Sequence, residues 1–386
     1  MTPAARLQAA AEVLDRILAG RAPEPALSGW ARASRYAGSK DRAAVRDHVF
    51  DALRQRRSLA ALGGADTGRG LILGLLRRSG DFSALGAGPH APPPLDDAEA
   101  AHMAAPVRMR PLEALDCPDW LAPHLRRALG ADFAPVMEAL RHRAPVFVRV
   151  NLARTDRDGA IAALAADGIA STPHPLAPTA LELGAGARRL RHAAAYAQGL
   201  VEPQDAASQA VVAALPALSG QRVLDYCAGG GGKALAMAAR GAKVSAHDID
   251  PRRMRDIPPR AARAGVRIAL PKRLRADFDL VLADAPCSGA GSWRRDPAGK
   301  WALTPARLAG LRAQQAAALD AAAAHLRPGG VLAYATCSLL RCENDDAVAA
   351  FARRSPGWTL TARHVFTPLQ GGDGFFLALL RRDATA

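Results

Sequence analysis

The stretch RVLDYCAGGGGK, residues 222–233, decides the fold. A short apolar run leads into four consecutive glycines, and a helical pattern begins directly after them. Glycines at such a turn let the backbone approach a ligand closely at the start of a helix. From Asp205 onward, segments with helical periodicity alternate with short apolar runs typical of buried strands. This alternation predicts an α/β fold with a mostly parallel, doubly wound, Rossmann-like sheet.

The glycine-rich turn is compatible with two kinds of cofactor. Gly229, Gly231 and Ala234 fit a loose G-x-G-x-x-A pattern, which is typical of dinucleotide sites. A Walker A loop is excluded, because Cys227 and Ala234 occupy the positions of its first Gly and its Ser/Thr. Asp248 ends the next apolar run, where an acid binds ribose hydroxyls in doubly wound folds; the alternative is a turn or cap residue. The pattern alone leaves nicotinamide and S-adenosylmethionine equally open.

Two cysteines each follow a short apolar run: Cys287 in LVLADAPCSG and Cys337 in VLAYATCS. We expect both at the carboxyl edge of the sheet, where such folds bind ligands. A thiolate that adds to carbon-6 of cytosine makes carbon-5 nucleophilic, and a second thiol nearby could assist resolution of the adduct. Either cysteine alone would indicate only a buried core residue. The pair favours a methyl donor over nicotinamide.

Two charged residues are candidates to support this chemistry. Asp284 could hydrogen-bond the amino group or ring nitrogen of a cytosine and stabilise charge as the ring is attacked. A thiol needs a polar or cationic neighbour to ionise, since its free pKa is about 8.5. Lys233, one of only five lysines, is a candidate for that neighbour. The alternative for Lys233 is a charge on a helix surface.

The segment SWRRDPAGKW, residues 292–301, carries three basic side chains and two tryptophans. Phosphate contact and base stacking are plausible roles for such residues, which makes Arg294, Arg295 and Lys300 candidate RNA contacts. A solvated charged loop is the alternative for each of them. The Glu-Asn pair at 343–344 is interpreted as the start and cap of the next helix.

We expect three regions along the chain. Residues 1–97 comprise helical patterns and a Gly/Pro-rich linker that ends at residue 97. Residues 98–204 form a small mixed α/β domain that binds RNA, in which VFVRV (146–150) predicts a strand. Residues 205–386 form the methyltransferase domain, which closes with the strand FFLALL (375–380).

The composition is ordinary for a globular chain, with 49% hydrophobic and 23% charged residues among 386. A formal net charge of +15 is compatible with a polyanionic partner. The five cysteines include no close C-x-x-C pair, so neither a disulfide framework nor a metal site is indicated. No signal-peptide pattern is present, and no apolar run approaches the roughly 20 residues needed to span a bilayer. We expect a cytoplasmic monomer without a metal or a membrane partner.

Over residues 140–386 these motifs resemble the RsmB/Nop/Sun family of RNA cytosine-5 methyltransferases, specifically its bacterial ribosomal RNA branch. The ordered set of two cysteines is the most specific part of the resemblance. The matching segments are VRVN (148–151), QDAASQ (204–209), LDYCAGGGGK (224–233), the acid at 248, DAPCSGAGSWRRDP (284–297), ATCS (335–338), EN (343–344) and DGFF (373–376).

The resemblance implies a role for each matching residue. The family's nucleophile is the cysteine of the TCS motif, hence Cys337, and the cysteine of the Pro-Cys loop, Cys287, assists breakdown of the adduct. Lys233 lies near the reacting groups. The residues that bind S-adenosylmethionine map to Cys227, Ala228, Gly229, Gly230, Gly231, Gly232, Lys233, Asp248 and Asp284.

Two features depart from the family pattern. The family's loop usually reads C-A-A-P-G-G-K-T, whereas Gly229, Gly230 and Ala234 replace its Ala, Pro and Thr here. The family also has an acid on a third strand that contacts the adenine of the donor. Between residues 266 and 279 this chain offers only Asp277, which lies close to the next strand.

The sequence therefore predicts an S-adenosylmethionine-dependent enzyme that methylates carbon-5 of a cytosine in ribosomal RNA through a covalent adduct with Cys337. A DNA cytosine-5 methyltransferase, which would use Cys287 as its nucleophile, is one alternative. A non-catalytic RNA-binding assembly factor with a degenerate methyltransferase fold is another. A nicotinamide-dependent enzyme is disfavoured, because nothing in the sequence marks a hydride-transfer site.

Overall fold

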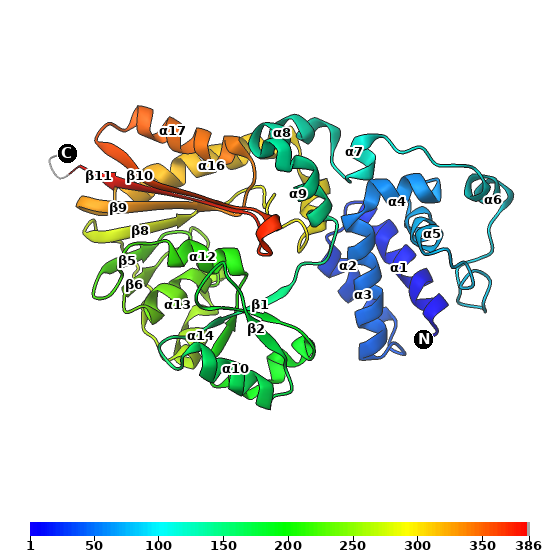
Figure 1. The fold of residues 1–386 in the computed structure, drawn as a ribbon, viewed down its shortest axis with the longest axis horizontal. Helices are drawn as coiled ribbons and strands as arrows, with labels where there is room; N and C mark the ends of the chain where they lie inside the picture. The colour runs from blue at the N-terminus through cyan, green and yellow to red at the C-terminus, as the bar shows by residue number, and fades with distance from the viewer. Residues whose placement is uncertain (384–386) are drawn as a thin grey trace. The chain divides into compact units, whose positions relative to one another are not determined.

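The computed structural model describes residues 1–383, which form two compact units (Figure 1). One unit comprises residues 1–143 and 293–302, and the other comprises residues 144–292 and the chain from 303 onward. The boundary expected at residue 97 lies inside the first unit. The segment 293–302, expected within the methyltransferase domain, also belongs to the first unit. The last three residues of that expected domain, 384–386, lie outside the described range.

The first unit is helical. Its apolar core includes Val13, Leu14, Val49, Leu53 and Leu73, all buried at helical spacing on α1, α3 and α5. By length and apolarity, no single helix in residues 1–383 could cross a membrane, and only the bent pair α4 and α5 passes that test jointly. The α-helices of this unit are α1 (Pro3–Leu18), α2 (Pro23–Ala33), α3 (Ser39–Arg54), α4 (Arg56–Gly63), α5 (Gly68–Ser79), α6 (Asp97–Ala104), α7 (Pro111–Ala114), α8 (Ala122–Leu129), α9 (Phe133–Leu140) and α15 (Pro297–Ala302).

The second unit begins with a small antiparallel sheet in the order β2-β3-β1-β4. The strand predicted from VFVRV is confirmed, and its apolar side chains Val148 and Val150 pack with Leu164 of α10. The elements of this part are β1 (Val146–Val150), α10 (Arg157–Ala166), β2 (Ser171–Pro173), β3 (Ala180–Leu183), α11 (Ala194–Ala197) and β4 (Val201–Pro203).

A seven-stranded sheet forms the rest of the second unit, in the order β10-β11-β9-β8-β5-β6-β7. The five strands from β9 to β7 are parallel, and β11 and β10 are antiparallel additions at one edge. The mostly parallel sheet predicted from the sequence is therefore confirmed. The strands are β5 (Arg222–Asp225), β6 (Lys243–Ala246), β7 (Ile268–Ala269), β8 (Phe278–Asp284), β9 (Leu326–Thr336), β10 (Trp358–Phe366) and β11 (Phe375–Arg382).

Helices cover both faces of this sheet (Figure 1). Because side chains alternate along a strand, Leu280 and Leu282 of β8 face one apolar cluster while Val281 and Ala283 face the other. The first cluster lies under α12 (Ala206–Ala213), α13 (Gly232–Ala239) and α14 (Ile257–Ala264). The second lies under α16 (Pro305–Ala323) and α17 (Asp345–Arg354). The carboxyl ends of β5, β6, β8 and β9 consequently meet at one edge.

Candidate active site

The glycine-rich turn connects β5 to α13 at the carboxyl edge of the sheet. Gly231 precedes α13 with a φ of +80°, and a Cβ at this position would lie 2.7 Å from Cγ1 of Ile257. Both conditions require glycine. Gly229 has a φ of +50°, and its N–H donates to Oδ2 of Asp248 over 2.9 Å. The turn is therefore fixed against the end of β6.

Asp248 follows β6 and is 2% exposed. Its Oδ2 accepts from Gly229, its Oδ1 accepts from the N–H of Asp250 over 3.0 Å, and Arg253 forms an ion pair with it at 3.2 Å. These contacts are those of the turn residue that was the alternative interpretation of Asp248. The ribose contact stays a prediction, and the same carboxylate holds the turn that would approach the donor.

Asp225 ends β5 directly before the glycine-rich turn, and neither of its buried carboxylate oxygens has a hydrogen-bond partner among the described residues. Burial, followed by the charge of Asp284, raises the pKa of Asp225 to about 7. An unpartnered buried carboxylate is costly, and a cationic ligand group would satisfy it. S-adenosylmethionine carries an ammonium and a sulfonium, so the residues present fit this donor.

Lys233 lies in the first turn of α13 and is 8% exposed. Its Nζ donates to Oδ2 of Asp284 over 2.6 Å and lies 4.8 Å from the centre of the Phe375 ring. Burial opposes the charge on Lys233, but the charge and hydrogen bond of Asp284 outweigh it and raise the pKa of this lysine. The interpretation of Lys233 as a helix-surface charge is wrong, because the side chain points into the sheet edge.

Cys287 and Cys337 follow β8 and β9, two adjacent parallel strands, and their sulfur atoms lie 3.4 Å apart. Both cysteines are free thiols. The hydrogen bond between the two thiols lowers the pKa of Cys337 against the effect of burial, and the charge of Lys233 acts in the same direction. The same bond, together with burial, raises the pKa of Cys287. Cys337 is therefore the thiol of the pair that ionises first.

Glu343 connects the two cysteine loops from a fully buried position. Its carboxylate accepts from the backbone N–H and the hydroxyl of Ser288, which follows Cys287, and from the hydroxyl of Ser338, which follows Cys337. Gln315 of α16 donates to the same carboxylate over 2.9 Å. One side chain thus fixes both loops.

Asn344 extends this support, because its Nδ2 donates to the carbonyl oxygen of Ser338 over 2.8 Å and its Oδ1 accepts from Thr336. The interpretation of the Glu-Asn pair as merely the start of a helix misses this role. The sequence signal for this role is an acid within eight residues of the TCS motif, together with a serine directly after each of the two cysteines. Its meaning depends on the pairing of β8 with β9, which local pattern does not reveal.

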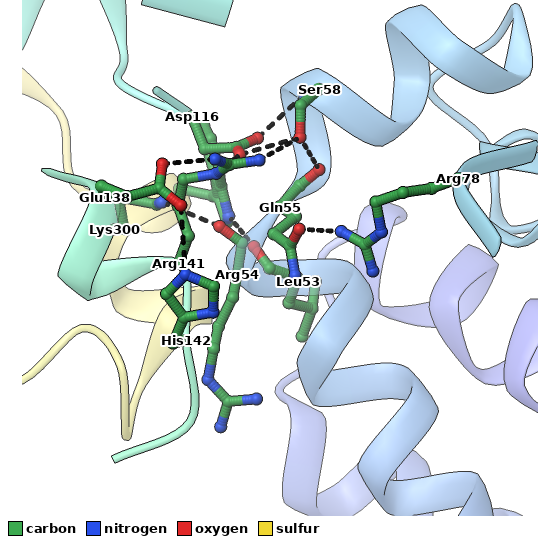
Figure 2. A network of polar contacts seen from close by, with 11 residues as sticks. Leu53, Arg54, Gln55, Ser58, Arg78, Asp116, Glu138, Arg141, His142 and Lys300 are labelled. Carbon is green, nitrogen blue, oxygen red and sulfur yellow. Dashed lines mark hydrogen bonds and ion pairs between the residues drawn. The ribbon is translucent and has the colours of Figure 1, made fainter. Parts of the chain in front are cut away.

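The candidate RNA contacts occupy very different environments. Lys300 lies in α15 and is only 1% exposed; its Nζ donates to the carbonyl oxygen of Arg54 over 3.2 Å. Figure 2 shows Lys300 inside a network of polar side chains that includes Ser58, Asp116 and Arg141. This burial contradicts the predicted phosphate contact of Lys300, because its ammonium is enclosed and donates to a backbone carbonyl.

The two arginines of the same segment differ from each other. Arg294 is also buried, and its carbonyl oxygen accepts a hydrogen bond from Arg54. This placement contradicts a direct contact of the Arg294 side chain with RNA. Arg295 is exposed, so a phosphate contact of this residue stays a prediction.

The remaining sequence candidates lie in or near the glycine-rich turn. Cys227, Ala228, Gly230 and Gly232 all belong to it, and burial raises the pKa of Cys227 to about 12, as suits a thiol that takes no part in the chemistry.

Asp277 pairs with Arg222 at 2.7 Å, at the amino end of β5. It therefore lies at the edge opposite the glycine-rich turn and does not replace the third-strand acid of the family.

Two family models match the chain. The first is described as 16S rRNA methyltransferase RsmB/F and covers residues 212–381. The second is the ferredoxin-like domain of RsmF/B-like methyltransferases and covers residues 117–188. The first match contains the glycine-rich turn, both cysteine loops and Glu343.

Named relatives agree with these matches. Ribosomal RNA small subunit methyltransferase B of Citrobacter koseri is 35% identical over 284 residues, which are 68% of this chain and 66% of that protein. The protein of the same name in Klebsiella pneumoniae is 36% identical over 282 residues, 68% of this chain and 65% of that protein. The match thus spans slightly less than two thirds of the length of these relatives.

Solved structures share the fold. The crystal structure of PH0851 has a TM-score of 0.77 at 20% identity and covers 99% of both chains. A methyltransferase homolog protein from Pyrococcus horikoshii has a TM-score of 0.61 at 23% identity, covering 71% of this chain and 100% of that one.

Proposed function

This chain belongs to the RsmB/Nop/Sun family, in its bacterial ribosomal RNA branch, and from that premise we propose that it methylates carbon-5 of a cytosine in ribosomal RNA, with S-adenosylmethionine as the donor. The observation that carries the proposal is the pair of thiols of Cys287 and Cys337, 3.4 Å apart at the carboxyl edge of the sheet. Two free thiols at this distance, beside a Lys–Asp pair, suit a reaction that forms and then breaks a carbon–sulfur bond.

Cys337 starts the reaction. Its thiolate adds to carbon-6 of the cytosine, and the electron pair of the carbon-5–carbon-6 double bond becomes available at carbon-5. S-adenosylmethionine, when bound, would supply an electrophilic methyl group to carbon-5 and leave as S-adenosylhomocysteine. Loss of the proton from carbon-5 then restores the double bond, and the bond to the sulfur of Cys337 breaks, which regenerates the thiolate.

Asp284 and Lys233 stabilise the charges of these steps. The carboxylate of Asp284 would accept a hydrogen bond from the exocyclic amino group of the cytosine and so orient the ring. Lys233, which already pairs with Asp284 over 2.6 Å, places a positive charge beside the Cys337 thiolate. Asp225 and the glycine-rich turn would hold the cationic donor.

Cys287 acts later than Cys337. Its thiol is hydrogen-bonded to Cys337 in the free protein, and that bond is the main cause of its raised pKa. Addition of Cys337 to the ring consumes the thiolate and removes this cause. Cys287 can then release its own proton to solvent, and the resulting thiolate accepts the proton from carbon-5, which releases the methylated base.

The decisive test compares two single variants. Cys337→Ala should abolish methylation while S-adenosylhomocysteine still binds, because the thiolate acts on the base and not on the donor. Cys287→Ala should form the adduct and fail to release it, so a protein–RNA complex that resists denaturants should accumulate on a denaturing gel. The double variant should lose this complex. Cys342→Ala, which removes another free thiol, serves as the matched control and should retain turnover.

Two outcomes would contradict the proposal. If Cys337→Ala still forms an adduct and Cys287→Ala does not, the roles are reversed and the DNA-type reaction gains support. If neither variant loses activity, the two thiols are core residues.

Bisulfite sequencing of ribosomal RNA from a deletion strain tests the substrate, because a single cytosine should lose its methylation there.

A further inference from the structure

A basic groove of about 670 Å³ lies at the amino edge of the seven-stranded sheet, opposite the active site. It is lined by the first residues of β5, β6 and β8, by the ends of α13 and α14, and by the connection between β7 and β8. Five basic side chains contribute to its lining, namely Arg222, Lys243, Arg267, Arg273 and Arg275.

Most of this charge is not neutralised. Asp277 pairs with both Arg222, at 2.7 Å, and Arg275, at 3.4 Å. The three others, Lys243, Arg267 and Arg273, are exposed, and their side chains have no hydrogen-bond or ion-pair partner within residues 1–383. Like charges gathered without partners repel each other, so the groove is suited to an anionic ligand.

The chain topology explains why this surface is open. Val244 and Ala246 of β6 face the cluster under α13, so Lys243 and Ser245 lie on the other face of the sheet. On that face α16 contacts β8 and β9, and the connection from β7 to β8, residues 270–277, contains no helix. Leu274 of this connection packs against the apolar cluster on that face, while Arg273 and Arg275 beside it line the groove.

The groove is too far from the active site to belong to it. β8 begins with Phe278 at the groove and ends with Asp284 at the active site, and seven residues at about 3.3 Å each span roughly 20 Å. A nucleotide in the active site cannot touch both edges. A ligand that reaches both must be an extended polyanion, and RNA is one.

We propose that this groove, defined by Lys243, Arg267 and Arg273, binds the phosphodiester backbone of the substrate RNA at a position distant from the target cytosine. The identity of the ligand as RNA rests on the proposed function; the existence of an anion site does not. Adjacent strands place Arg222 and Lys243 in register, about 4.8 Å apart, so the charges form a row and not a single point. Such contacts position RNA without reading its sequence.

The test removes the three unpaired charges together in Lys243→Gln/Arg267→Gln/Arg273→Gln. The affinity for transcribed small-subunit ribosomal RNA should fall at least about tenfold, and the slope of log K against log[salt] should become shallower by about 2, because three fewer counterions are released. The KM for this RNA should rise while kcat and the affinity for S-adenosylhomocysteine remain unchanged. Lysine or arginine at all three positions, as in Lys243→Arg/Arg267→Lys/Arg273→Lys, should restore binding.

The matched control is Arg307→Gln/Arg353→Gln/Arg381→Gln, which removes the same charge from exposed positions on α16, α17 and β11. Equal weakening by this control would show that only total charge matters and would overturn the proposal, as would an unchanged affinity in the groove variant. Failure of the proposed function can be distinguished from failure of the groove proposal. In the first case neither the wild type nor the groove variant methylates RNA, but the groove variant still binds RNA more weakly than the wild type.

Discussion

Replacing Lys300 by methionine should abolish a rise of stability with pH that the wild-type protein shows. Burial lowers the pKa of Lys300 from 10.5 to about 8 in the folded protein. The unfolded chain therefore binds more protons than the folded one between these two pH values, and stability increases with pH there. The penalty for burying the charged lysine is present in full well below pH 8 and has disappeared above the unfolded pKa.

The magnitude follows from the difference between the two pKa values. Each pKa unit corresponds to about 1.4 kcal/mol, so full burial of the charged lysine costs about 3 kcal/mol. Between about pH 7 and about pH 9.5 the free energy of unfolding of the wild type should gain about 2 kcal/mol relative to Lys300→Met. At neutral pH the free energies of unfolding of the two proteins should differ by less than the full cost of burying the charge, because the variant also loses the hydrogen bond to Arg54.

The assay is urea unfolding of both proteins at a series of pH values, followed by intrinsic tryptophan fluorescence. Lys40→Met, at an exposed position of α3, is the matched control and should track the wild type at every pH. A difference between wild type and Lys300→Met that stays constant over this range would refute the reasoning, since Lys300 would then keep an ordinary pKa and would not be enclosed as described.

Three further predictions concern the active site. Asp248→Ala should weaken S-adenosylhomocysteine binding by at least about 1 kcal/mol, measured by calorimetry, because the N–H of Gly229 loses its acceptor; unchanged affinity would exclude Asp248 from the donor site. Lys233→Met should shift the alkylation of Cys337, followed by site-resolved mass spectrometry, to higher pH, whereas the exposed Lys272→Met should leave it unchanged. Glu343→Gln should lower stability by on the order of 2 kcal/mol in thermal unfolding and should slow single-turnover methylation. The reason is that an amide cannot accept from every hydroxyl and amide donor that now contacts the carboxylate. Wild-type behaviour in both assays would show that Glu343 does not hold the two loops.

The parallel sheet and the placement of both cysteines were predictable because they depend on short-range signals. An apolar run marks each buried strand, and in a parallel sheet every such run ends at the same edge. Cys287 and Cys337 therefore had to approach each other once β8 and β9 were neighbours. Their distance of 3.4 Å was not predictable, because it depends on Glu343 and the two serines that it holds.

The segment 292–301 shows where local reasoning fails. Two tryptophans among basic residues indicate a nucleic-acid surface when only neighbours in sequence are considered. In the fold, Lys300 and Trp301 hydrogen-bond backbone carbonyls of Arg54 and Leu53, which are almost 250 residues away in sequence. Burial produced by such distant contacts has no local signature. The basic side chains Lys272, Arg273 and Arg275, by contrast, are exposed.

The roles proposed for the two thiols differ because their surroundings differ, although the residue type is the same. The hydrogen bond to Cys287 and the positive charge of Lys233 both lower the pKa of Cys337. The same bond, burial and the negative charge of Glu343 raise the pKa of Cys287. These surroundings favour the thiolate of Cys337 over that of Cys287, and the family resemblance implies the same residue as the nucleophile. Cys337→Ala is therefore the first variant to test.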